Sequence, residues 1–148
     1  MKNLQLRSFN ASDCAFLMSH YNPNLTTDES KALIDEWNQK SYQGAYFEMF
    51  AIVHGTAPAG WISLYAHDEI TISAGMEVIE SARGKGLAAA ALAQALNHAK
   101  MCGYTTATAQ VRKNNAASLR LHEKCGFVIT GECVTSQGNA AVWLRREL

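Results

Sequence analysis

Three features that often identify a class of protein are missing from this sequence. It has no excess charge, because 13 basic residues balance 13 acidic ones, so no overall field favours a nucleic acid or an anionic membrane. Its longest uninterrupted apolar run, Leu87–Ala93, is far shorter than a membrane span. The residues after Met1 contain no apolar stretch typical of a signal peptide. We therefore expect a cytoplasmic protein without a nucleic-acid or membrane partner.

The sequence also lacks the closely spaced cysteines of metal and redox sites. Its four cysteines are far apart and form no C-x-x-C pair: Cys14, Cys102, Cys125 and Cys133. We expect buried free thiols, no metal site and no cysteine nucleophile, because no base is placed beside any of them. A chain of 148 residues with ordinary apolar content is long enough for one domain with a real core, and we expect residues 1–148 to form it.

The sequence does contain a glycine-rich turn between an apolar strand and an alanine-rich helix. Residues 83–88 read Arg-Gly-Lys-Gly-Leu-Ala. The first turn of a helix presents N–H groups without intrahelical partners and carries partial positive charge. Gly84 and Gly86 have no side chains to block a ligand, and Arg83 and Lys85 add charge. The pattern predicts a phosphate or pyrophosphate site, with an ordinary strand-to-helix turn as the alternative.

Two common phosphate-binding motifs do not fit this turn. A Walker loop requires a glycine five residues before its Gly-Lys step, and no glycine lies five residues before Gly84 or Gly86. A dinucleotide fold requires an acidic residue roughly 20 residues after its glycines, and residues 103–111 contain no acid. The phosphate-bearing ligand must therefore be recognised by another pattern.

Hydrophobic periodicity and capping signals predict an α+β fold in the order β-α-α-β-β-β-α-β-α-β-β. Because a helix joins strands 69–79 and 105–111, these two strands should be parallel within a mixed, mostly antiparallel sheet flanked by helices. The first two helices should lie over one end of the sheet. In this position they would form one wall of a cleft, on the side where a second substrate, the acceptor, would lie. The expected strands are 4–9, 46–54, 60–65, 69–79, 105–111, 127–134 and 139–146. The expected helices are 10–20, 27–41, 87–102 and 115–125.

Two segments resemble signatures of one family. Residues 83–88 resemble the R/Q-x-x-G-x-G/A pyrophosphate loop of the GNAT superfamily of N-acetyltransferases. Asn115–Phe127 looks like that family's second signature, N-x-A-S followed by E-K-x-G-F. The expected order of elements is also the family's, so the resemblance covers essentially the whole chain.

The resemblance implies that acetyl-CoA lies in a V-shaped opening between two splayed parallel central strands. The backbone of Met76 and Val78 is expected to pair with the pantetheine arm, and Asn115 and Ser118 to approach it from the helix at 115–125. The N–H groups of the loop are expected to bind the pyrophosphate. The loop residues concerned are Arg83, Gly84, Lys85, Gly86, Leu87 and Ala88.

The resemblance also implies that a neutral amine attacks a thioester, which requires a base for the amine proton and a donor to the leaving thiolate. His122 stands where many members have a tyrosine acid, which is similar to the phosphinothricin and amino-acid N-acetyltransferase branch. The alternative is that His122 only packs or forms hydrogen bonds and transfers no proton. Glu77 is the candidate base, with Asp68 and Glu69 as other possibilities. The Val78 N–H is expected to stabilise the oxyanion.

The remaining histidines and aromatic residues receive weaker expectations. Surface or loop positions are expected for four histidines to which no role is assigned, His20, His54, His67 and His98. Four aromatic residues could line the acceptor pocket or could occupy ordinary core and surface positions: Tyr21, Trp37, Tyr42 and Tyr46.

The sequence thus predicts an acetyl-CoA-dependent N-acetyltransferase that uses acetyl-CoA as co-substrate and no metal. Its acceptor is expected to be a primary amine of a small molecule or amino acid, acetylated by direct transfer in a ternary complex. A protein N-terminus or lysine is the alternative acceptor. A non-catalytic acyl-CoA-binding regulatory module is the alternative function. The C-terminal hairpin is a possible homodimer interface.

Overall fold

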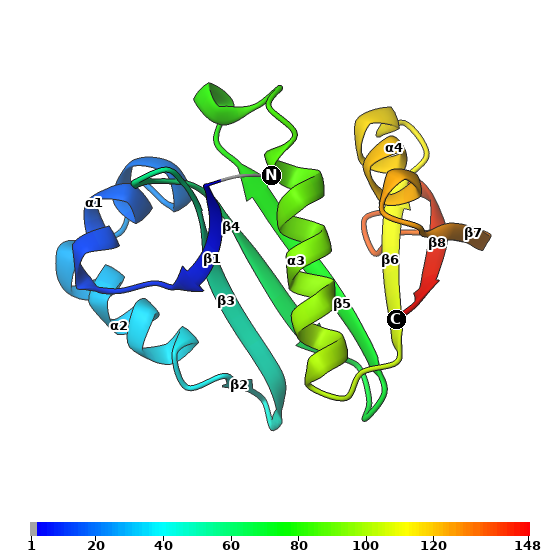
Figure 1. The fold of residues 1–148 in the computed structure, drawn as a ribbon, viewed down its shortest axis with the longest axis horizontal. Helices are drawn as coiled ribbons and strands as arrows, with labels where there is room; N and C mark the ends of the chain where they lie inside the picture. Colours follow the sequence, from blue (N-terminus) through cyan, green and yellow to red (C-terminus); the bar gives the residue numbers. More distant parts are fainter. Residues whose placement is uncertain (1–2) are drawn as a thin grey trace.

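The structure, a computed structural model, describes residues 3–148 as one mixed sheet with helices on both faces (Figure 1). The sheet has eight strands in the order β1-β3-β4-β5-β6-β8-β7, with the short β2 paired to β3. Only β5 and β6 pair in parallel among the described strands. The strands are β1 (Leu4–Ser8), β2 (Ser41–Tyr42), β3 (Ala45–His54), β4 (Ala57–Ala66), β5 (Thr71–Val78), β6 (Thr106–Arg112), β7 (Val128–Val134) and β8 (Ala140–Glu147).

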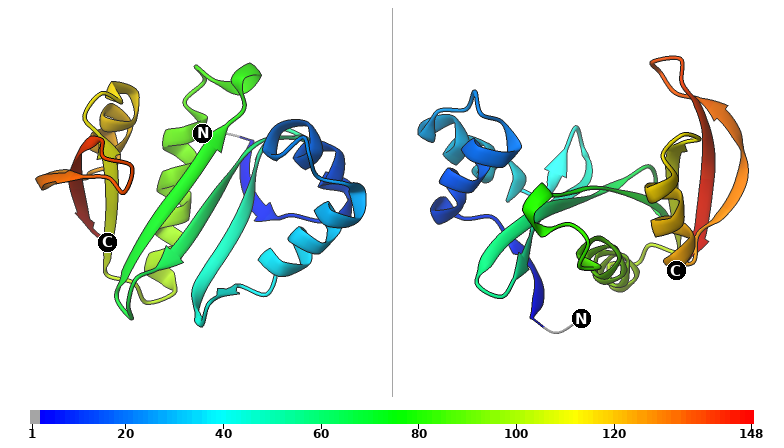
Figure 2. Two further views of the ribbon diagram at one scale, coloured as in Figure 1. Left: turned by 180° about the vertical axis from the view of Figure 1, so that it is seen from behind. Right: turned by 90° about the horizontal axis from the view of Figure 1, so that it is seen from above.

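The helices cover the two faces of the sheet unequally (Figure 2). One face carries α3 (Leu87–Met101) and α4 (Ala116–Lys124), both of which pack into the larger core cluster. The other face carries α1 (Cys14–Phe16) and α2 (Thr27–Trp37) at the β1/β3 end only. The predicted α+β class and the position of the first two helices are confirmed.

The alanine-rich helix α3 shows why the larger core forms. Its alanines recur every four residues on the face toward the sheet, where Ala91, Ala95 and Ala99 are fully buried. Leu92 and Leu96 fill the space beside them. The small side chains let the helix axis approach the sheet closely, while alanine and leucine favour the helix itself.

Several predicted boundaries were wrong. The second helix starts at the predicted capping box, where Thr26 and Glu29 bond reciprocally. It ends at Trp37, because residues 38–40 turn the chain, with Lys40 at φ 57°, before β2 begins at Ser41. The first helix divides into a 3₁₀ turn, the short α1 and a π-helical turn. Strand β5 starts late, because the Asp68 carboxylate accepts the N–H groups of Ile70 (2.9 Å) and Thr71 (2.8 Å) and turns the chain.

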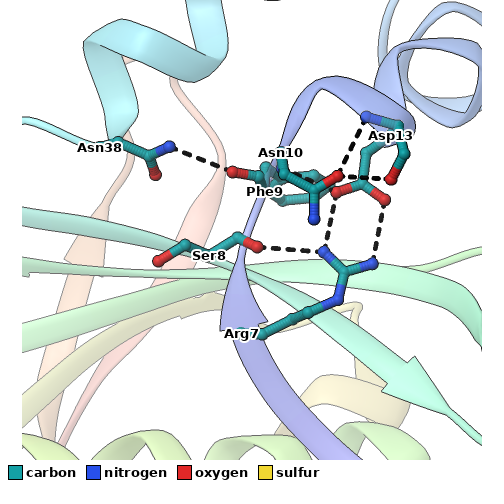
Figure 3. Close-up of polar contacts among 7 residues, drawn as sticks. Arg7, Ser8, Phe9, Asn10, Asp13 and Asn38 are labelled. Atoms are coloured by element: carbon teal, nitrogen blue, oxygen red, sulfur yellow. Dashed lines mark hydrogen bonds and ion pairs between the residues drawn. The ribbon is translucent and has the colours of Figure 1, made fainter.

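A polar cluster fixes the start of the helical region to β1 (Figure 3). The Arg7 guanidinium donates to both carboxylate oxygens of Asp13, at 2.8 and 3.0 Å. The same carboxylate accepts the Asn10 N–H at 2.9 Å. The Asn38 amide, just after α2, donates to the Phe9 carbonyl at 3.1 Å. These contacts fasten β1, the first turn and the end of α2 together.

The cysteines are free, as expected, but the expectation of burial was wrong for three of them. Cys14 is buried, whereas Cys102 is exposed and Cys125 and Cys133 are half-buried. Cys102 follows the last turn of α3, and Cys133 lies on β7 at the edge of the sheet, so neither side chain reaches the core. In residues 3–148 no helix is both long and apolar enough to cross a membrane.

Candidate active site

The parallel strands β5 and β6 separate in the middle of the sheet. They share three register pairs, Thr71 with Thr106, Ile72 with Ala107 and Ser73 with Thr108. Beyond Ser73, β5 continues to Val78 and β6 to Arg112 without a further recorded pair in the described chain. The gap opens toward the end of the sheet where α3 begins (Figure 1). The predicted splay is confirmed.

Every second residue of β5 directs its backbone N–H and carbonyl groups toward this gap. The Ile79 N–H donates to Ala59 at the start of β4, at 2.9 Å. Because backbone direction alternates along a strand, Glu77 also faces β4, while Met76 and Val78 direct their N–H and carbonyl groups into the gap. The gap therefore offers hydrogen-bonding groups of the kind that an extended amide-bearing ligand uses.

Glycine at position 60 allows β4 to approach β5 closely at this point. A Cβ atom added to Gly60 would lie 2.1 Å from the Glu77 carbonyl oxygen and 2.9 Å from the Val78 Cα. Both contacts are with backbone, which cannot rotate away. Gly60 thus helps to set the line of the strand that carries the gap-facing groups.

A cleft of about 560 Å³ occupies the gap. It contains most of the predicted site residues, from β5, the glycine-rich loop and α4. Those predicted residues are Met76, Glu77, Val78, Arg83, Ala88, Asn115, Ser118 and His122. Sequence reasoning missed Tyr65 on β4 and Gln110 on β6, because only the strand order places these residues beside β5.

A second cavity of about 390 Å³ adjoins the cleft at the start of α3. The loop contributes Gly84 and Gly86, which have φ of 80° and 76°. Left-handed φ values of this kind suit glycine. Across the cavity, Arg120 and Lys124 extend from α4. Sequence reasoning missed both, although their spacing of four places them on one helix face.

The predicted loop residues do not all face these cavities. Leu87 lines the second cavity, whereas Lys85 is among the lining residues of neither one. The Arg83 N–H donates to the Glu80 carbonyl at 3.2 Å, so the N–H groups available to a ligand begin at Gly84.

The Arg83 side chain ties the loop to β5. Its Nη2 lies 2.6 Å from Glu77 Oε1, and its Nε donates to the Val78 carbonyl at 2.9 Å. The Glu77 carboxylate is therefore engaged by a cation rather than free. The Val78 carbonyl is likewise occupied, which leaves the Val78 N–H and both Met76 groups for the gap.

The start of α4 orients His122. Asn115 caps the helix by accepting the Ser118 N–H at 3.1 Å. One turn later His122 Nδ1 lies 2.8 Å from the Ser118 carbonyl. A carbonyl only accepts, so Nδ1 carries the hydrogen and Nε2 is the free nitrogen. Phe127 packs edge-on against the ring at 5.1 Å.

An aromatic cluster lies on the sheet face that carries α1 and α2, next to the part of this face that no described helix covers. Trp61 on β4 contacts Phe16 and Tyr21 edge-on, at 6.3 and 5.0 Å between ring centroids. Tyr21 also contacts Trp37 at 5.3 Å. Trp37 thus takes the ordinary core position that was one of its alternatives, and Tyr21 is exposed beside it. Phe16 and Trp61 complete the cluster.

Tyr46 belongs to a different environment. Its hydroxyl donates to the buried Glu48 carboxylate, and its ring stacks on Tyr104. Burial, together with Glu48, raises the pKa of Tyr46. His98 on α3 also bonds Glu48, at 3.1 Å, a contact that the sequence did not predict. Tyr46 packs against the core shared with α3, away from the aromatic cluster.

The comparison with protein families identifies the class. The model of the acetyltransferase (GNAT) domain matches residues 4–128, and the chain belongs to this family of acetyltransferases. No cluster of His, Cys, Asp or Glu suited to a metal ion occurs in the described part of the chain, residues 3–148.

Individual relatives extend this finding. The chain is 26% identical over 141 residues to a methionine sulfoximine and methionine sulfone acetyltransferase of Salmonella typhimurium, covering 87% of this chain and 82% of that protein. It is 26% identical over 144 residues, with the same coverage, to the L-amino acid N-acyltransferase MnaT of Escherichia coli.

Solved structures share the fold at lower identity. The microcin C7 self-immunity acetyltransferase MccE, in complex with acetyl-CoA and AMP, superposes with a TM-score of 0.82 at 15% identity, over 100% of this chain and 94% of that one. The spermidine N-acetyltransferase of Vibrio cholerae, in complex with CoA and spermine, gives 0.77 at 19% identity, over 99% and 96%.

Proposed function

We propose that this protein transfers the acetyl group of acetyl-CoA directly to the primary amine of a small molecule, with an amino acid as the favoured acceptor. The observation that carries the proposal is the gap between β5 and β6, with free backbone groups along one side and a glycine-rich helix start at its mouth. Membership of the GNAT family supplies the reaction class.

The residues present fit acetyl-CoA. A Cβ atom on Gly84 would meet nothing within 4 Å, so the loop is open toward a ligand. The first-turn N–H groups of α3 are available to phosphate oxygens. Arg120 and Lys124 add positive charge from the opposite wall. Met76 and the Val78 N–H are the proposed partners of the ligand's amide groups.

His122 is the proposed proton carrier. Bound acetyl-CoA supplies the acetyl group as a thioester. With Nδ1 held by the Ser118 carbonyl, a neutral His122 ring accepts a proton at Nε2, and the charged ring donates one there. The same nitrogen can thus take the amine proton and return it to the departing sulfur. Glu77 is the alternative base, but it must first give up its contact with Arg83.

Two observations favour an amino acid with an apolar side chain as the acceptor. The two relatives with 26% identity are named for acyl transfer to amino acids or amino-acid analogues. The uncovered face of the sheet is bordered by the aromatic cluster of Phe16, Tyr21 and Trp61, which suits an apolar side chain. In this proposal the acceptor reaches the cleft from this face and the donor enters between the strands, an arrangement that favours direct transfer.

Thiol release from acetyl-CoA tests the proposal. The purified protein is offered each L-amino acid, methionine sulfone, spermidine and a set of peptides, and acetylated products are identified by mass. We expect release with one or more free amino acids and initial-rate patterns of a ternary complex. Release with peptides alone indicates a protein acceptor. CoA binding without release from any amine indicates a binding module, and absence of CoA binding refutes the proposal.

A further inference from the structure

The point where β5 and β6 separate is closed by a hydrogen-bonded cluster, formed by His67, Ser73 and Thr108. We infer that Ser73 is a specificity-determining residue, which fixes the inner end of the cleft and so restricts the acyl group to a short chain. This inference rests on the proposed function. It concerns residues outside the two family signatures.

Ser73 makes three polar contacts although it is 4% exposed. Its Oγ lies 2.8 Å from the Thr108 carbonyl, 2.9 Å from Thr108 Oγ1 and 2.7 Å from His67 Nε2. Ser73 and Thr108 are also the last register pair of the parallel ladder. The side-chain bonds therefore join the strands at the position where their backbone pairing ends.

The hydrogens in this cluster can be assigned by counting. A hydroxyl has one hydrogen, and the Thr108 carbonyl can only accept, so the Ser73 hydroxyl donates to it. Ser73 Oγ then accepts from Thr108 Oγ1 and from His67 Nε2. Each donor has an acceptor, and removing Ser73 would take this acceptor from the half-buried Thr108 hydroxyl and from the exposed His67 ring. His67 lies at the exposed loop position expected for it, and its bond to Ser73 is a contact that the sequence did not predict.

The cluster lies at the inner end of the cleft. Ala74 and Ala109, the residues that directly follow the Ser73–Thr108 pair, both line the cleft. Tyr65, which contacts His67 edge-on at 5.4 Å, lines it as well. The cleft runs from here to Arg83 and the helix start. A ligand with its phosphates at the helix start therefore directs its opposite, acyl-bearing end toward Ser73.

Removing the hydrogen bonds between Ser73 and Thr108 should extend the inner end of the cleft. In wild-type protein the Ser73–Thr108 bonds stop the strands from separating further, so a long acyl chain meets closed backbone. Without those bonds the next step of the ladder can open, and additional methylene groups find space. The affinity for CoA itself, which is held at the other end, should change little.

The test compares the binding of three non-transferable ligands by titration calorimetry, without an acceptor. The ligands are CoA, S-ethyl-CoA and S-hexyl-CoA. The variants are Ser73→Ala and Thr108→Val, the second of which keeps its shape and the carbonyl acceptor. Thr130→Val is the matched control, because Thr130 Oγ1 also bonds a carbonyl across two strands, at 3.3 Å from the Trp143 carbonyl, but on the exposed hairpin.

We expect the wild-type protein to prefer S-ethyl-CoA over S-hexyl-CoA. Ser73→Ala should reduce this preference by about tenfold, the size expected for a lost buried hydrogen bond. Thr108→Val should reduce it less, because the Ser73 hydroxyl still donates to the carbonyl, and Thr130→Val should leave it unchanged. CoA affinity should stay within about threefold throughout.

Two outcomes overturn the inference, and they differ from failure of the proposed function. The inference is wrong if Thr108→Val and any folded Ser73→Ala protein keep the wild-type preference. It is also wrong if the wild-type protein binds both thioethers equally. If the wild-type protein binds none of the three ligands, the proposed function itself fails.

Discussion

At the scale of single residues, Gly60 has little freedom to change. Replacing it with alanine would place a methyl group 2.1 Å from the Glu77 carbonyl oxygen, so β4 and β5 must move apart. We expect Gly60→Ala to lower the free energy of unfolding by about 1–3 kcal/mol, as overpacking does, and to weaken CoA binding because Met76 and Val78 shift.

Urea unfolding and calorimetry measure these two effects. Gly131→Ala is the control, because a Cβ at Gly131, also in a strand, meets nothing within 4 Å. Equal losses in both variants would mean that the close approach of β4 and β5 is unimportant.

His122 allows a second prediction at this scale. His122→Phe removes Nε2 but keeps an aromatic ring against Phe127. Because a positioned acid or base typically contributes 10²–10⁴-fold, kcat should fall by at least about 100-fold, while the affinity for CoA stays near wild type. His54→Phe, at the end of β3, should leave kcat unchanged.

Steady-state kinetics with the accepted amine decides between the two candidate proton carriers. If Glu77→Gln lowers kcat more than His122→Phe does, the carboxylate is the base, and His122 serves only to pack.

At the scale of elements, the loop before α3 provides a test with a well-matched control. Gly84 and Gly138 have similar left-handed φ values, 80° and 86°, and a Cβ at either one meets no atom within 4 Å. Alanine should therefore destabilise both sites by about 1–2 kcal/mol. Only Gly84→Ala places a methyl group where we propose the phosphates bind, so only it should weaken CoA binding, by about tenfold.

Thermal unfolding and calorimetry on both variants check this prediction. A matching loss of affinity in Gly138→Ala would show that backbone strain, rather than obstruction of the loop, lowers binding.

Local patterns explain which elements could be predicted from the sequence. The capping box at Thr26, the alanines of α3 and the glycine-rich loop depend on neighbours within a few positions, so their signals are complete in the sequence. The end of the second helix was missed, because the Asn38 side chain bonds the distant Phe9 carbonyl just after the helix, and Ser41 pairs with Tyr46 in the sheet. Sheet pairing of this kind overrides helix propensity.

The site was predictable where it follows a contiguous signature and not where tertiary contacts create it. His122 and Asn115 come from such a segment and line the cleft. The Ser73–Thr108 bond joins residues 35 positions apart, and the Arg83–Glu77 ion pair depends on how the loop folds back. Nothing in the spacing of these residues indicates either contact.

At the scale of the whole molecule, the Arg7–Asp13 pair should make stability depend on pH. Burial raises the pKa of Asp13, but the hydrogen bonds from Arg7 and the Asn10 N–H outweigh it, so the pKa is lower than in the unfolded chain. A lowered carboxyl pKa stabilises the fold fully above the unfolded value of about 3.9. This contribution is lost as pH falls through the folded value.

Asp13→Asn should therefore be less stable than wild type at pH 7, and the difference should shrink as the solution is acidified below about pH 4. Urea unfolding across this range measures it, with the exposed Asp35→Asn as the control. A difference that stays constant with pH would mean that the pair contributes packing rather than charge.

The separation of β5 from β6 gives the protein a sheet edge in its interior. Strand edges are normally found at the rim, where unpaired N–H groups attract other strands. Here helices α3 and α4 pack together on one face beside that edge. A narrow, extended ligand can enter the cleft along the edge. The amides of Met76 and Val78 should thus exchange with deuterium as quickly as those of a rim strand, while the Ile72 amide beside them stays protected. Addition of CoA should slow exchange at residues 76 and 78 alone in β5, as if a strand had been added to the sheet.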